Sequence, residues 1–142
     1  MLRKFPGWAW LALLMLVGTA TWYALPPKFA GFDVKRHDGG SPMFHFSDSD
    51  ASRTSPVVIS IPGRRLANED DRYRMELEKV WMSTYVPKSL AFKSVGSALC
   101  NYSRQGEQPF CELYEFEDAH GGGGHEYYFY VGNWPVARGD SR

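Results

Sequence analysis

The sequence predicts an α+β protein: an N-terminal transmembrane helix followed by one small two-layer domain. An uncharged apolar segment occupies residues 8–25, and a stretch with helical spacing of apolar residues covers about residues 68–84. Several β-branched and aromatic runs then follow one another closely. Because closely spaced strands favour antiparallel pairing, we expect a β-meander with one amphipathic helix packed on one face.

The apolar segment at residues 8–25 is long enough to cross a bilayer as a helix, which takes about 20 residues. Arg3 and Lys4 precede it, and Pro26 follows it. Positive charge before the span keeps the N-terminus in the cytoplasm. We therefore expect a single-pass protein of the inner or cytoplasmic membrane, contacting the lipid bilayer through residues 8–25, with a periplasmic or extracellular C-terminal domain.

A cleavable signal peptide is the alternative interpretation of this segment. Such a peptide has a basic start, a shorter apolar run and small residues at the cleavage site. The small residues Gly18, Thr19 and Ala20 resemble such a site, but the apolar run continues to Leu25. This continuation favours an uncleaved anchor.

Composition divides the chain into four parts. Residues 1–26 are the anchor or uncleaved signal, and residues 57–135 are the extracytoplasmic domain. Between them, residues 27–56 are the expected stalk or linker. Residues 37–56 are rich in Ser, Asp, Gly and Pro, and residues 28–36 are either a short strand or an extended part of the stalk. We expect contact between the stalk and the domain at residues 43–46, which include Phe44 and Phe46. Residues 136–142 are polar and form the predicted flexible tail.

The domain is expected to contain one helix and a series of strands. Asn68 is a suitable N-cap, and the acidic residues after it suit the first turn of a helix. Helical spacing places the charged residues on the solvent face, Glu78 among them. The expected strands are residues 57–61, residues 90–95 and 98–103 (two strands, or one long strand bent at Gly96), residues 110–117 and residues 126–131.

Cys100 and Cys111 are the two cysteines of the chain, and both follow the predicted anchor. An even number of cysteines in an exported domain favours a disulfide. The two residues face each other if residues 104–107 form a hairpin turn between two strands. The alternatives are two free core thiols or a pair of metal ligands, but the close Cys and His spacing of a zinc site is missing.

An acidic, aromatic hairpin near the C-terminus is the main functional signal. No Lys or Arg occurs between Gln105 and Ala137, while acidic and aromatic residues alternate there. With Tyr127 and Phe129 facing inward, alternate residues of the last strand point outward. Tyrosine is common at interfaces and charge steers encounter, so this surface suits a basic protein partner. The predicted binding residues are Glu112, Glu115, Glu126, Tyr128 and Tyr130; the alternative is a solvated sheet face that only keeps the domain soluble.

His120 and His125 flank four glycines and are weak candidates for a metal pair. Four consecutive glycines do not position ligands, so a hairpin loop is the simpler interpretation. The sequence shows no catalytic constellation and indicates no cofactor. The formal net charge is zero, and no basic stripe indicates nucleic-acid binding.

These features favour a membrane-anchored extracytoplasmic module that binds a protein partner at the outer face of the membrane. An inhibitor or immunity-type protein and an accessory factor of an envelope complex both fit this description. The alternative is a single-pass structural subunit of a membrane or envelope complex, held mainly by its transmembrane helix. A metal-dependent enzyme is a third reading, and we do not expect catalytic activity.

Overall fold

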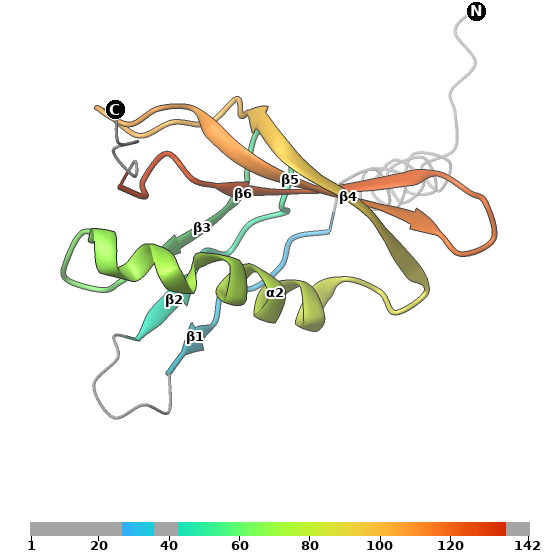
Figure 1. Cartoon of the computed structure of the whole chain (residues 1–142), viewed down its shortest axis with the longest axis horizontal. Helices are drawn as coiled ribbons and strands as arrows, with labels where there is room; N and C mark the ends of the chain where they lie inside the picture. Colours follow the sequence, from blue (N-terminus) through green and yellow to red (C-terminus); the bar gives the residue numbers. More distant parts are fainter. Residues whose placement is uncertain (1–26, 36–42, 136–142) are drawn as a thin grey trace, which may run out of the picture.

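The computed structural model describes residues 27–35 and 43–135, which form a small α+β domain with a mixed six-stranded sheet and one α-helix (Figure 1). The elements in chain order are β1 (Asp33–Val34), β2 (Phe44–Phe46), β3 (Val57–Ser60), the 3₁₀-helix η1 (Asn68–Tyr73), α2 (Arg74–Tyr85), β4 (Leu90–Leu99), β5 (Phe110–Asp118) and β6 (Gly124–Tyr130).

The strands are arranged in the order β1-β2-β3-β6-β5-β4. The predicted meander β4-β5-β6 is confirmed, since both pairs are antiparallel. The prediction of a purely antiparallel sheet is wrong, because β3 and β6 are parallel neighbours. Strands paired in the middle of a sheet with both faces covered are apolar at every position. Val57, Val58 and Ile59 are all buried, so this unbroken apolar run marks β3 as an inner strand.

The helix begins at a cap that differs from the expected one. The N-cap of η1 is Ala67, whose backbone N–H donates to Asp70 Oδ2 at 2.8 Å. The same carboxylate accepts two hydrogen bonds from the Arg64 guanidinium, at 2.7 and 2.9 Å. Arg64 holds the pKa of Asp70 below its usual value through these bonds. Asp70 therefore remains charged although it is buried, and it fixes the loop that follows β3 to the first turn.

The main core lies between α2 and one face of the sheet. Leu77 and Trp81 of α2 are buried there. The Trp81 ring meets Phe129 of β6 edge-to-face, with 5.3 Å between centroids. Tyr114 and Tyr127 complete this aromatic layer. A large aromatic side chain buried in this way removes about 150–250 Å² from water, so these few rings supply much of the core.

The described part of the predicted stalk belongs to the domain. Within residues 27–56, β1 and β2 extend the sheet beyond β3, and Phe44 and Phe46 are fully buried. The ring of Phe32 stacks on Phe46 at 4.5 Å. The expected stalk is thus corrected to two short strands, β1 at the edge of the sheet and β2 next to it, and β1 lies within residues 28–36, where a short strand was one of the two expectations. The polar composition of the segment indicated a linker. Strand β2 forms all the same, because the alternation of Phe44, His45 and Phe46 places both phenylalanines on the core face.

Within the described ranges, no helix is both long and apolar enough to cross a membrane. The predicted anchor, residues 1–26, and the predicted tail, residues 136–142, lie outside the described residues.

Candidate functional site

The predicted binding residues lie on β5 and β6, which are antiparallel neighbours. Alternation divides them between the two faces of the sheet. Glu112 lies on the same face as Tyr114, toward α2, whereas Glu115 and Glu126 lie on the opposite face. The sequence therefore identified two separate acidic surfaces as one.

Tyr128 and Tyr130 point away from α2, as alternation predicts, but the expectation that they are exposed is wrong. Their exposed fractions are 9 % and 1 %. They form a second apolar cluster with Val58 and the two cysteines. The segment after β4 packs on this face, since the Tyr102 ring meets the Tyr130 ring edge-to-face with 4.9 Å between centroids. A surface covered in this way cannot present either ring to a partner.

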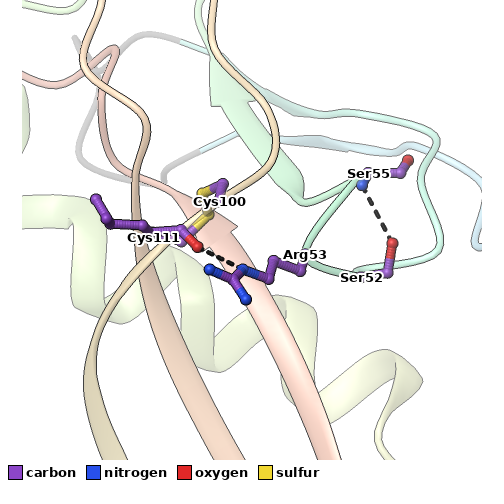
Figure 2. Close-up of a disulfide and its surroundings, with 6 residues drawn as sticks. Ser52, Arg53, Ser55, Cys100 and Cys111 are labelled. Carbon is purple, nitrogen blue, oxygen red and sulfur yellow. Dashed lines mark hydrogen bonds between the residues drawn. A yellow bond between two sulfur atoms is a disulfide. The ribbon is translucent and has the colours of Figure 1, made fainter.

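Cys100 and Cys111 form a disulfide within this second cluster, with 5.7 Å between their Cα atoms. Figure 2 shows Arg53 beside it, and the Arg53 Nε donates to the Leu99 carbonyl at 2.7 Å. The predicted strand register is shifted, because Cys111 is paired with Ala98 and Cys100 follows the end of β4. The bridge thus joins the end of β4 to the start of β5.

Glu115 and Glu126 face each other directly across β5 and β6. Like charges in this position repel each other. Each carboxylate accepts a hydroxyl hydrogen bond, from Ser94 to Glu115 and from Tyr128 to Glu126, the latter at 2.8 Å. These bonds offset part of the repulsion and leave a small acidic spot on the face opposite α2.

Glu112 belongs to a polar cluster under α2. Its carboxylate contacts the Arg74 guanidinium, which also donates to Asp71 at 3.1 Å. Glu78 of the same helix is completely buried, with its Oε1 3.9 Å from Arg74, and its Oε2 accepts the Tyr114 hydroxyl at 2.7 Å. The prediction that Glu78 faces solvent is wrong, because one turn of helix aligns it with Arg74 and turns both toward β5.

Burial, together with the nearby charge of Glu112, raises the pKa of Glu78 to about 8. The bond from Tyr114 and the charge of Arg74 oppose this effect without cancelling it. Burial beside Glu78 also raises the pKa of Tyr114. The cluster therefore carries a neutral Glu78 next to the Arg74–Glu112 ion pair at neutral pH.

A groove of about 390 Å³ lies beside this cluster, between α2 and the hairpin of β4 and β5. Met75 and Met82 of α2 form one wall, and Phe92 and Val95 of β4 lie across from them. Val95 is paired with Tyr114 and Phe92 with Phe116, so both face the helix side of the sheet. Glu112 and Lys79 are the charged residues of this otherwise apolar lining.

A second cleft, of about 460 Å³, adjoins the groove, because Glu112 lines both. Phe110 and Trp134 contribute apolar surface to it, while Asp71 and Arg74 contribute charge. Five large apolar side chains are markedly exposed within the described residues, and all lie on or beside these two hollows: Met75, Phe92, Val95, Leu99 and Phe110.

This apolar surface was not predicted from the sequence. Phe92, Val95 and Leu99 lie in residues that the sequence predicts to be strands, but the prediction did not say which side chains of these strands are exposed. They are exposed because α2 covers β6 and β5 but stops short of β4, the last strand of the sheet. The signal that could have revealed them is the excess of apolar residues over what one helix of this length can cover.

His120 and His125 are not brought together as metal ligands. His125 Nε2 lies 3.7 Å from Asp118 Oδ1, and both side chains are about half exposed. In the part of the chain that the structure describes, no three His, Cys, Asp or Glu residues are arranged to hold a metal ion. His120 and His125 therefore belong to the exposed end of the β5–β6 hairpin.

Comparison of the chain with models of protein families, with curated proteins and with solved structures finds no match in any of the three.

Proposed function

We propose that this chain is a protein-binding module tethered to the outer face of a membrane, and that its binding surface is the groove between α2 and the β4–β5 hairpin. The observation that carries this proposal is the gathering of five exposed large apolar side chains around the groove and its adjoining cleft. Soluble domains seldom leave a contiguous apolar surface open to water unless it binds something.

The composition of the groove favours a protein partner. Interfaces are enriched in aromatic residues and methionine, and their centres are poor in charge. Met75 and Met82 are flexible side chains that adapt to the shape of a partner. Lys79 and Glu112 supply one charge of each sign, which suits orientation of the partner more than attraction to a strongly charged one.

Two features support the proposed location. The Cys100–Cys111 disulfide is typical of domains that fold in an oxidising compartment. The basic and apolar N-terminal sequence is typical of an anchor that leaves the following domain outside the cytoplasm. An inhibitor or immunity-type protein and an accessory factor of an envelope complex both need such a tethered binding domain.

The test is affinity capture of the tagged full-length protein from its native membranes, followed by mass spectrometry. The groove variant is Met75→Ser with Phe92→Ser, and the matched control on the opposite face is Glu115→Gln with Glu126→Gln. Loss of two central apolar contacts is expected to reduce capture at least tenfold, whereas the control retains the partner. Each variant is checked for its native disulfide and its near-ultraviolet circular dichroism.

Two outcomes contradict the proposal. Capture that depends on Glu115 and Glu126 but not on Met75 and Phe92 moves the interface to the opposite face of the sheet. Capture that is lost when residues 1–26 are replaced by an unrelated anchor favours the structural subunit held by its membrane helix.

A further inference from the structure

The outer edge of β4 is an open pairing surface. Among the residues that the structure describes, β4 ends the sheet, with β5 on one side and no strand on the other (Figure 1). Leu99 is paired with Phe110, whose carbonyl accepts the Val131 N–H at 2.9 Å on the side of β6. The backbone groups of Leu99 therefore point away from β5, and alternation turns those of Ser97 and Val95 outward as well.

Both ends of this edge are closed. The Leu99 carbonyl is occupied by the Arg53 side chain. At the other end the register shifts between Phe92 and Ser94, so that Lys93 forms a bulge. Bulges and lysines are common means of ending pairing at a sheet edge. The open segment is therefore residues 94–98, and its limits allow little sliding of a strand along it.

We propose that two copies of this chain pair antiparallel through residues 94–98 of β4, with the two-fold axis at Gly96. In this register Val95 faces Ser97 of the second copy, and the two such pairs exchange about four backbone hydrogen bonds. Leu99 then lies beside Phe92 of the second copy, on the helix side of the sheet. A shift of two residues in either direction leaves Phe92 or Leu99 without an apolar neighbour.

Charge and area are compatible with a second copy at this edge. Lys93 is the one charged residue of β4, and the two-fold places the two lysines at opposite ends of the pairing. Phe92, Val95, Leu99 and Phe110 are each about half exposed. An aromatic side chain buries about 150–250 Å², and Val and Leu bury less, so the exposed halves of these side chains amount to roughly 300 Å² per copy before the backbone edge is added. The pair thus falls below the size of stable interfaces, about 1,200 Å² in total, which predicts a dimer that dissociates on dilution.

Pairing at this edge places the two apolar grooves side by side. The helix side of the joined sheet becomes one floor, formed by β4 and β5 of both copies, with an α2 helix along each outer side. The inference goes beyond the proposed function, because the pairing needs no other protein in the groove.

The test is disulfide crosslinking of the full-length Gly96→Cys protein in its native membrane. A Cβ at Gly96 meets no atom within 4 Å, so the substitution is accommodated. The two-fold brings the two Cα atoms to about 4.5 Å in a non-hydrogen-bonded pair, within the range of a disulfide. Mild oxidation is expected to give a dimer on a non-reducing gel. Ser94→Cys is the control on the same face; it faces Ala98 of the second copy and is expected to crosslink at least tenfold less.

A second pair of variants tests the backbone edge itself. Ser97→Pro removes an outward N–H and leaves the β4–β5 hydrogen bonds intact, because proline is tolerated on an edge strand in this orientation. In the Gly96→Cys background it is expected to reduce the dimer at least tenfold, whereas Ser97→Thr retains it. The proposal is overturned if the Gly96→Cys protein gives no dimer, or if the Ser94→Cys protein crosslinks equally well. Neither outcome depends on whether the proline variant folds. Partner capture is also measured with the Ser97→Pro protein. A variant that no longer dimerises but still captures the partner shows that pairing and binding in the groove are separate properties.

Discussion

Replacing Glu78 by glutamine is expected to change how the stability of the domain depends on pH. The buried carboxyl has a pKa of about 8, whereas in the unfolded chain its pKa is the ordinary value of 4.5. Between these values the folded state holds a proton that the unfolded state releases. The free energy of unfolding therefore falls as the pH rises through this window, by about 1.4 kcal/mol per pH unit for one proton.

The contribution of Glu78 is fully present below pH about 4.5 and lost by pH about 8, and it amounts to at most roughly 5 kcal/mol. Glutamine mimics the neutral carboxyl, since its amide oxygen can still accept the Tyr114 hydroxyl. The variant should match the wild type near pH 5. Near pH 9 it should be more stable by several kcal/mol, because it has no buried charge to form.

The measurement is chemical denaturation of the full-length protein in mild detergent between pH 5 and pH 9, followed by tryptophan fluorescence, to which the buried Trp81 and Trp134 contribute. Glu117→Gln is the matched control, because it removes an exposed carboxylate of β5. Its pH profile should run parallel to that of the wild type. Parallel profiles for Glu78→Gln and the wild type would refute the proposed burial of a neutral carboxyl under α2.

Two further predictions concern the disulfide and the first strands. Replacing Cys100 and Cys111 together by serine should lower the free energy of unfolding by about 2–3 kcal/mol, and the loss should equal that caused by reductant in the wild type; stability of the wild type unaffected by reductant would contradict this. Phe46→Ala should cost about 3–5 kcal/mol in a denaturant titration, because its ring is fully buried, whereas His45→Ala beside it should cost far less. If both substitutions change the free energy of unfolding by the same small amount, the segment does not pack in the core and the predicted stalk is the better description.

The sequence was informative where a pattern repeats over many residues. The helix and the three C-terminal strands extend over 7 to 12 residues each, and their periodicity gave their type and approximate limits. Strands β1 and β2 have two and three residues, which is too short for periodicity to show. They are strands because β3 offers an open edge to β2, and β2 in turn offers one to β1, which is a property of the folded sheet.

The candidate site was predicted less well, for reasons that lie in tertiary packing. Alternation assigned Tyr128 and Tyr130 to the correct face of β6, but it contains no information on the segment that covers this face. Glu78 was assigned to solvent by its charge, although the helix turns it toward Tyr114. The exposure of Phe92 depends on where α2 ends relative to β4, and no local pattern records that distance.

The parallel pairing of β3 with β6 has a consequence for the order in which the domain folds. Val57 is joined to Phe129, about 70 residues further along the chain, so this contact closes a long loop and forms late. The hairpins of β4, β5 and β6 and the nearby disulfide need only local contacts. The two phenylalanines of β2 reach their final packing only after β6 has been synthesised and has paired with β3. A chain that is synthesised from its N-terminus therefore exposes Phe44 and Phe46 to water until β6 has emerged, which makes this interval the period of greatest risk of aggregation.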